Sequence, residues 1–316
     1  MTNARAHEKY DALIQRCEGL SPLRTAVAHP CDETSLRGAL AAAKALLIAP
    51  ILVGPGAKIS ALAAAQGLDL SGLKLIDVPH SHAAAAAAVE LVRKGEADAI
   101  MKGSLHTDEL MAEVVNKQTG IRTERRVSHV FIMDAPNYPK PLFITDAAIN
   151  IFPGLDDKKD IVQNAIDLAI ALGIPRPKVA ILSAAETVNS KIPSTVDAAA
   201  LCKMAERGQI TGGVLDGPLA LDNAISREAA LAKNIKSEVA GDADILIAPD
   251  LEAGNILAKE LTFLAGADAA GIVLGARVPI ILTSRADTLR TRMASCAVAA
   301  LYAAARRAAL AAKLGG

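Results

Sequence analysis

Aromatic residues are scarce in this sequence, which has no tryptophan, four phenylalanines and three tyrosines. Hydrophobic residues still make up 52% of the chain, so the core must be built from aliphatic side chains and alanine. Alanine has the best helix propensity of all residues and lets helices pack closely. With 316 residues, the chain is long enough for two such domains.

An excess of charge is also missing, because Lys+Arg and Asp+Glu both number 34. A neutral chain has no global field that attracts nucleic acid, and the sequence lacks the basic stripe that such binding needs. We therefore expect no nucleic-acid partner. Any anionic ligand must be held by a local site.

Cysteines are few and scattered, at Cys17, Cys31, Cys202 and Cys296. They show neither the paired spacing of a zinc site nor a dense disulfide framework, which favours free thiols in a reducing compartment. The first residues contain no apolar signal-peptide core, and the apolar tracts are too short to cross a bilayer. The sequence predicts a cytoplasmic protein without a membrane partner.

Several catalytic motifs are absent as well. All six histidines lie in the first 129 residues, which leaves the later segments without a local histidine for a Ser-His-Asp triad or a zinc site. No GxSxG elbow, no P-loop and no GxGxxG at the first strand occurs. A carboxylate cluster of Asp216, Asp222 and Asp250 is a conceivable metal site, but we predict no metal.

Short β-branched runs alternate with longer alanine-rich segments along most of the chain. The predicted strands are 45–55 (with a helix end), 73–79, 97–103, 126–135, 141–150, 178–184, 212–218, 243–249 and 279–284, and the predicted helices are 81–96, 157–173, 194–208, 251–266 and 288–313. This alternation predicts an α/β protein with mostly parallel sheets covered by helices on both faces, an α/β/α arrangement.

Two domains are expected, and the first is discontinuous. The turn-rich segment 137–141 is the best boundary, and the last strand and helix need an existing sheet to join. We predict one domain from residues 1–140 plus 275–316 and another from residues 141–274. Ligands of such sheets bind at the carboxyl ends of the strands.

The stretch IILTSRADT, residues 280–288, places a hydroxyl, a cation and a carboxylate where a strand becomes a helix. Ser284 and Arg285 would lie beside free backbone N–H groups at a helix N-terminus, which is a site for phosphate. Asp287 or Thr288 would alternatively cap the helix. A plain Arg–Asp pair with a cap remains the competing interpretation.

A second polar segment, MKGSLHTDEL (101–110), also follows a predicted strand. Lys102, Gly103, His106 and Thr107 would present charge, N–H groups and a hydroxyl to an anion, although helix capping alone would explain this pattern.

Two further segments are candidates for ligand contact. In residues 215–226, Asp216 and Gly217 form a predicted turn after a strand, and Asp222 and Asn223 follow in an apolar stretch. In residues 248–261, Gly254 and Asn255 lie in the first turns of a predicted helix. A helical glycine costs about 1 kcal/mol against alanine, so a close approach by a ligand or another chain is suspected.

The segments MKGSLHT, VSHVFIM, FITDAAIN, STVDAAAL, LDGPLALDNAIS, DILIAPDLEAGNILAKEL and AGIVLGARVPIILTSRADT together resemble the phosphate acetyltransferase/phosphate butyryltransferase family. The resemblance implies reversible transfer of an acyl group between coenzyme A and inorganic phosphate. It also implies a homodimer without cofactor, and a fold like the isocitrate and isopropylmalate dehydrogenases with the active site in the cleft between two domains.

The resemblance assigns roles to single residues. Arg285 corresponds to the arginine associated with phosphate, Ser284 to the serine associated with the CoA thiol, and Ser128 to a further family serine. The acetyl-acting branch has an aspartate, a proposed base, where this chain has Thr291. The SRAD sequence is closer to the butyryl-acting branch, and Asp287 is a possible substitute base.

The reaction explains why these residues would stand together, because attack of phosphate on a thioester creates an oxyanion at the carbonyl beside the phosphate, which is itself an anion. Arg285 and a helix N-terminus would offset that charge, and a thiolate of pKa about 8.5 needs little help to leave. No activated nucleophile is visible, so a ternary complex is expected. The alternatives are a metal- and NAD(P)-dependent dehydrogenase of the isopropylmalate type and a catalytically silent CoA-binding homologue.

Overall fold

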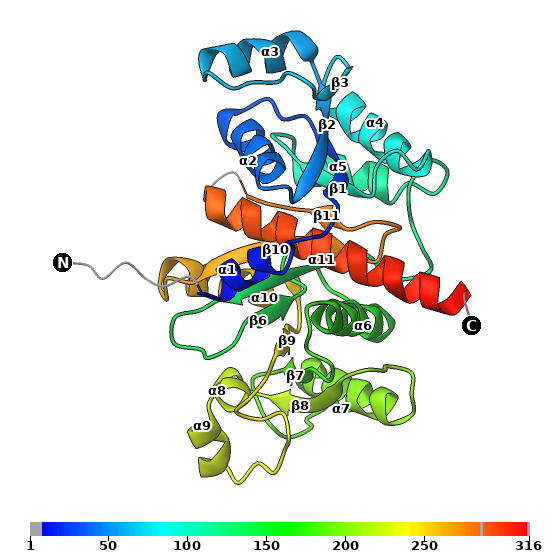
Figure 1. The fold of residues 1–316 in the computed structure, drawn as a ribbon. Helices are drawn as coiled ribbons and strands as arrows, with labels where there is room; N and C mark the ends of the chain where they lie inside the picture. Colours follow the sequence, from blue (N-terminus) through cyan, green and yellow to red (C-terminus); the bar gives the residue numbers. More distant parts are fainter. Residues whose placement is uncertain (1–7, 285–286, 315–316) are drawn as a thin grey trace, which may run out of the picture. The chain divides into compact units, whose positions relative to one another are not determined.

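The computed structural model describes residues 8–284 and 287–314. Its chain divides into two compact units. The terminal unit consists of Tyr10–Arg125 and Ala270–Gly316, and the central unit consists of Arg126–Ala269 with Met1–Lys9. Each unit is an α/β structure, and Figure 1 follows the chain through both of them in colour.

The sheet of the terminal unit is almost entirely parallel. Its strands lie in the order β3-β2-β1-β4-β11-β10, and β10 alone runs antiparallel to its neighbour β11. The strands are β1 (Leu23–Ala28), β2 (Ile48–Gly54), β3 (Lys74–Asp77), β4 (Ala99–Lys102), β10 (Asp268–Leu274) and β11 (Ile280–Ile281).

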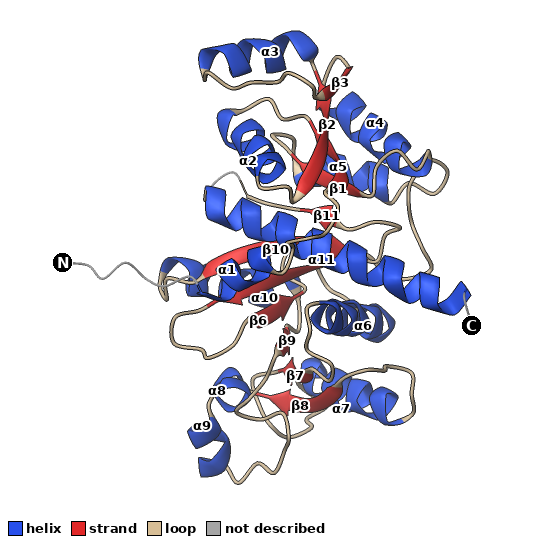
Figure 2. Ribbon diagram, viewed as in Figure 1, coloured by secondary structure: helices blue, strands red, loops and turns tan. Residues whose placement is uncertain are grey.

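Alanine-rich helices cover both faces of this sheet. They are α1 (Glu8–Gln15), α2 (Glu33–Lys44), α3 (Gly56–Ala65), α4 (Ser81–Arg93), α5 (Thr107–Val114) and α11 (Leu289–Leu314). Figure 2 shows α2 and α4 on opposite sides of β2, and α11 packs against α2 and β11. The buried positions of α2 and α4 include Ala39, Ala42, Ala84, Ala85 and Ala88, and these small side chains let the helices pack closely on the strands.

The central unit has a second set of strands in the order β5-β6-β9-β7-β8, in which only the β5–β6 pair is antiparallel. The strands are β5 (Ser128–Asp134), β6 (Leu142–Thr145), β7 (Lys178–Leu182), β8 (Val214–Leu219) and β9 (Ile245–Ile247). The helices are α6 (Leu155–Ala171), α7 (Pro193–Glu206), α8 (Leu221–Ile225), α9 (Arg227–Ala232) and α10 (Leu251–Phe263).

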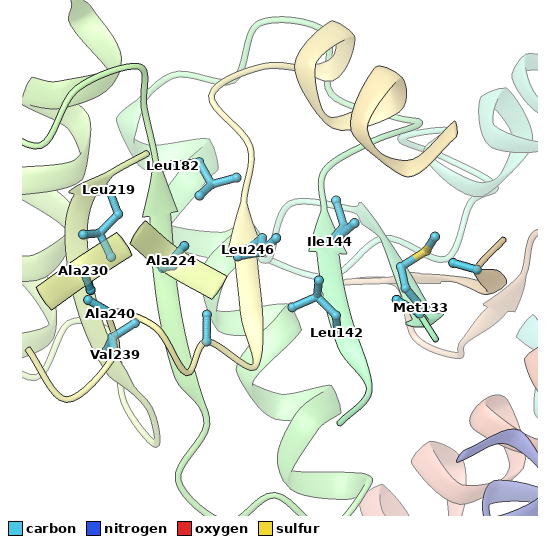
Figure 3. Packing of buried hydrophobic residues seen from close by; sticks show 14 residues of the cluster. Met133, Leu142, Ile144, Leu182, Leu219, Ala224, Ala230, Val239, Ala240 and Leu246 are labelled. Carbon is cyan, nitrogen blue, oxygen red and sulfur yellow. The ribbon is translucent and has the colours of Figure 1, made fainter. Parts of the chain in front are cut away.

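The core of the central unit is aliphatic, as the scarcity of aromatic residues requires. Figure 3 shows Leu142, Ile144 and Leu246 from neighbouring strands together with small alanines of α8 and α9. Each fully buried leucine or isoleucine of this kind stabilises the fold by about 1.5–3 kcal/mol relative to an exposed side chain.

The mostly parallel α/β class is thus confirmed, but several predicted elements were wrong in detail. The strand predicted at 279–284 is only Ile280–Ile281, and Asp216–Pro218 lies inside β8 rather than in a turn after it. The Gly217 backbone packs against Ile181 at an irregular point of the β7–β8 pairing, which hides the strand pattern. Strands β1 and β10 were not predicted at all.

None of the described helices combines the length and the apolar character that a membrane crossing requires.

Candidate functional site

Three strands of the terminal unit end at the same edge of its sheet. Strands β1, β4 and β11 are parallel neighbours, with Ala28 opposite Lys102 and Met101 opposite Ile281. A helix begins shortly after each strand end: α2 after β1, α5 after β4 and α11 after β11. We call the described residues at these strand ends and helix starts, 29–32, 102–107, 282–284 and 287–288, the strand-end site.

The strand-end site contains the predicted residues Lys102, Gly103, His106, Thr107, Ser284 and Asp287. Arg285 belongs to the same segment but lies outside the described residues. Two segments that the sequence places about 180 residues apart therefore share one edge of one sheet, because β4 and β11 are neighbours.

Gly103 is required by the close approach of strand β1. A side-chain Cβ at this position would lie 2.4 Å from the backbone oxygen of Ala28 and 2.5 Å from that of His29. The Gly103 N–H donates to the Ala28 carbonyl over 2.9 Å, and the Ser104 N–H donates to the His29 carbonyl over 2.9 Å. Glycine thus allows the β4 end to turn tightly along the β1 end.

His29 and Ser104 form a polar contact that sequence reasoning missed. The Ser104 hydroxyl donates to the His29 carbonyl over 2.9 Å and lies 3.1 Å from His29 Nδ1. His29 has a left-handed backbone with φ of 55°, which is uncommon for a residue other than glycine. Burial, followed by the charge of Lys58, lowers the pKa of His29. A non-glycine residue in such a conformation at a strand end is not visible in one sequence.

Two hydrogen bonds join Ser284 and Asp287. The Ser284 N–H donates to Asp287 Oδ2 over 2.6 Å, and the Asp287 N–H donates to the Ser284 carbonyl over 3.2 Å. Ser284 is exposed and Asp287 is half-buried. The carboxylate of Asp287 therefore helps to fix the backbone of Ser284.

The cap of α11 is Thr288 rather than Asp287. The Thr288 hydroxyl accepts from the Thr291 N–H over 3.2 Å, and the Thr288 carbonyl accepts from the Arg292 N–H over 3.2 Å. Thr291 is buried and its side chain contacts the Thr288 hydroxyl over 3.2 Å. Asp287 therefore does not cap α11, although the sequence made it a candidate for this role.

Arg292, in the first turn of α11, holds the end of β11. Its Nη1 donates to Thr283 Oγ1 over 2.8 Å and its Nη2 donates to the Ser284 carbonyl over 2.7 Å. Sequence reasoning missed this residue. One feature of the sequence could have identified it. Arg292 lies on the same helix face as the buried Ser295, Cys296 and Ala299, where a charged side chain is unexpected.

The strand-end site has the electrostatic character of an anion site. Lys102 and Arg292 are only 6% and 3% exposed, so their charges act in a poorly screened environment. The N-termini of α2, α5 and α11 each add a partial positive charge and free N–H groups. Asp32 and Asp287 equal these two cations in number, and α2 and α5 carry further carboxylates in their first turns, so the helix N-termini are the main feature that favours an anion. Phosphate binding at the strand-end site stays a prediction.

Other predicted site residues lie in the central unit. Ser128 begins β5, is fully buried, and its hydroxyl accepts from Asn164 Nδ2 over 2.8 Å. Gly254 lets α10 approach β6, because a Cβ there would lie 2.4 Å from the Asp146 carbonyl oxygen. Asn255 donates from Nδ2 to the Ala147 carbonyl over 3.0 Å. The close approach suspected at Gly254 is therefore made by the chain itself.

The remaining predicted residues lie around β8 and α8. Asp216 accepts from the Gly217 N–H over 2.8 Å through Oδ1, and the exposed Asp222 lies 3.7 Å from Lys233 Nζ. Asn223 is fully buried, donates to Glu186 and accepts from the Gly241 N–H over 2.7 Å at its backbone oxygen. Ligand contact by these four residues stays a prediction.

Within residues 8–284 and 287–314, no group of three or more His, Cys, Asp and Glu side chains is arranged to hold a metal ion. This includes the three aspartates that the sequence offered as a conceivable cluster.

Known proteins resemble this chain over nearly its full length. Residues 79–300 match the family described as "Phosphate acetyl/butaryl transferase". A phosphate acetyltransferase of Rhizobium meliloti is 68% identical over 95% of each chain, and a phosphate butyryltransferase of Clostridium acetobutylicum is 43% identical over 94% of this chain and 98% of its own. The crystal structure of a branched-chain phosphotransacylase from Enterococcus faecalis is 31% identical, covering 89% of this chain and 99% of that one with a TM-score of 0.76.

Proposed function

Because the chain belongs to the phosphate acetyl/butyryl transferase family, we propose that it transfers a short acyl group reversibly between coenzyme A and inorganic phosphate. Acyl-CoA and phosphate give acyl phosphate and CoA. The observation that carries this proposal is the strand-end site, where Gly103, Ser284 and Asp287 share one sheet edge with buried cations.

The phosphate is proposed to bind at the N-terminus of α11. There the helix dipole and the N–H groups of its first turn favour an anion, and Arg285 would add the guanidinium fork that the family resemblance assigns to it. Ser284 and Asp287, on either side of Arg285 in the sequence, are hydrogen-bonded to each other.

In the direction of acyl phosphate formation, an oxygen of phosphate attacks the thioester carbonyl. The tetrahedral intermediate carries an oxyanion, which the cations and N–H groups of the site stabilise. The carbon–sulfur bond then breaks, and the CoA thiolate leaves. We propose that the exposed Ser284 hydroxyl donates a hydrogen bond to the departing sulfur.

In the reverse direction, the thiol must lose its proton before it attacks the acyl phosphate. Thr291 has no acidic group and its side chain is buried, so it is not a base. We propose that Asp287, the half-buried carboxylate of the corner that accepts from the Ser284 N–H, takes this role. Because a free thiol has a pKa of about 8.5, transfer of its proton to a base near neutral pH costs little free energy.

The domain bounds, the oligomeric state and the location of the protein are also proposals. The terminal and central units are proposed to be the two domains, with bounds at residues 125/126 and 269/270 rather than at 140/141 and 274/275. The cleft between domains, the likeness to isocitrate and isopropylmalate dehydrogenases, the homodimer and the cytoplasmic location are implied by the resemblance and by composition. CoA acts as a substrate, and no added cofactor is expected.

The acyl group is proposed to be acetyl or a slightly longer chain. The 68% identical relative is named an acetyltransferase and the 43% identical relative a butyryltransferase, which favours acetyl. The SRAD corner, by contrast, is closer to the butyryl-acting branch.

The experiment measures thiol release from acetyl-, propionyl- and butyryl-CoA, with and without phosphate and with EDTA. We expect release that requires phosphate, that persists in EDTA, and that yields one acyl phosphate for each thiol. Thioester hydrolysis without phosphate, or binding of CoA without turnover, would contradict the proposal, and metal-dependent reduction of NAD(P) would identify a dehydrogenase instead.

A further inference from the structure

Arg292 is a buried cation that makes no ion pair within the described part of the chain. It is 3% exposed, and its Nε has no hydrogen-bond partner. Its charge interacts only at longer range with Asp287 and Asp32, and burial is the main influence on its pKa, which is lowered. An unpaired buried charge costs stability, so a role besides folding is expected for it.

The other side of Arg292 is shaped by a glycine. A Cβ at Gly38 of α2 would lie 2.8 Å from Arg292 Cδ. The missing side chain at Gly38 therefore creates the space through which the arginine reaches Thr283 and Ser284. Helices α2 and α11 together direct the guanidinium at the end of β11.

We propose that Arg292 is a positioning residue for phosphate: it holds Thr283 and Ser284 in place, and its buried charge is balanced when phosphate binds beside Ser284. This inference rests on the proposed function and adds to it a residue that does not touch the substrate. The hydrogen bonds from Nη1 and Nη2 tie Thr283 and Ser284 to the start of α11. Ser284 is therefore fixed before the anion arrives.

The variants separate the charge from the hydrogen-bonding fork. Arg292→Met removes both and replaces the charge by an apolar side chain of similar length. Arg292→Lys keeps the charge but cannot reproduce the fork. Gly38→Ala keeps the arginine and displaces it. The matched control is Arg290→Met, which removes a half-exposed arginine two residues earlier, paired with Asp11 over 2.9 Å.

Two measurements are made on each protein: steady-state kinetics, and the shift of the thermal midpoint on addition of inorganic phosphate. We expect Arg292→Met to raise KM for phosphate about tenfold to a hundredfold, the range for lost hydrogen bonds to a charged group, and to abolish most of the phosphate-induced shift. KM for acyl-CoA should stay within about twofold. Arg292→Lys and Gly38→Ala should fall between this variant and the wild type.

A purely structural role would lower the thermal midpoint and leave KM for phosphate and the phosphate-induced shift as in the wild type. That result overturns the inference. If Arg292→Met fails to fold, wild-type phosphate binding in both Arg292→Lys and Gly38→Ala overturns it equally. If the wild type shows no phosphate-dependent thiol release, the proposed function fails, while the phosphate-induced thermal shift still decides the role of Arg292.

Discussion

Replacement of Gly103 by alanine tests the tight turn at the end of β4. The new Cβ would lie 2.4 Å from the Ala28 carbonyl oxygen, 1.0 Å short of the 3.4 Å at which ordinary contact begins. The atoms in the way are backbone atoms of Ala28 and His29, so a change of side-chain rotamer cannot relieve the overlap. Either β1 and β4 separate at this point or the segment after β4 moves.

The cost of Gly103→Ala follows from these distances. Overpacking of a well-packed region costs about 1–3 kcal/mol. The displacement also stretches the bond from the Gly103 N–H to the Ala28 carbonyl, and a buried group left without its partner costs about 1–3 kcal/mol. We expect a loss of about 2–6 kcal/mol in the free energy of unfolding, compared with a total of about 5–15 kcal/mol for a protein of ordinary stability.

Urea unfolding and steady-state kinetics measure the two consequences of Gly103→Ala separately. KM for phosphate should rise, because Lys102 and the N-terminus of α5 move with the segment. Gly154→Ala is the matched control: Gly154 has φ of −73°, which alanine tolerates, and its nearest neighbour atom would be 3.9 Å away. Gly103→Ala with wild-type stability and wild-type kinetics would refute the assigned packing.

Three further variants test other parts of the structure. Asp287→Asn keeps an oxygen acceptor for the Ser284 N–H, so the free energy of unfolding measured in urea should change little. The rate of CoA attack on acyl phosphate should fall about a hundredfold, because the base is lost. An unchanged rate would show that Asp287 is not the base. His129 is fully buried, and burial, opposed by the charge of a nearby aspartate, lowers its pKa to about 4 from 6.5. The contribution of neutral His129 to the free energy of unfolding is therefore fully present above about pH 6.5, and about 3 kcal/mol of it should be lost as the pH drops to about 4. Urea unfolding of His129→Leu should show no such pH dependence over this range. An unchanged pH dependence in this variant would show that other groups cause it. Gly254→Ala places a Cβ 2.4 Å from the Asp146 carbonyl oxygen and should cost about 1–3 kcal/mol in urea unfolding, with wild-type KM for phosphate; full stability would show that α10 can move away.

The sequence predicted the α/β class because continuous apolar strands and alanine-rich helices alternate over most of the chain. Strand β10, Asp268–Leu274, was missed because its first four residues are one aspartate, two alanines and one glycine, which carry little strand preference. Its burial comes from strand pairing and helix cover that one sequence does not show.

The site was predictable where chemistry follows a strand directly. Ser284, Asp287, Lys102 and Gly103 were all proposed in this way, and the structure places β4 and β11 side by side, which the sequence did not predict. Their contact with a ligand stays a prediction. Arg292 was missed because its role depends on Gly38, which precedes it by about 250 residues and leaves the space that it occupies.

Glycine and asparagine in α10 show the opposite limit of sequence reasoning. Gly254 and Asn255 were predicted to contact a ligand, and the structure places them against the carbonyl groups of Asp146 and Ala147. A helical glycine indicates a close approach but does not say what approaches.

The kinetics of Arg285→Ala bear most directly on the phosphate site at the end of β11, with the fold checked by circular dichroism. We predict a loss of about 2–4 kcal/mol in kcat/KM for phosphate, the range for a preorganised transition-state donor, and partial recovery in Arg285→Lys. Arg290→Ala, which removes a neighbouring surface ion pair, should lose at most about 1 kcal/mol. A value of kcat/KM in Arg285→Ala close to that of the wild type would contradict the assignment of this corner as the phosphate site.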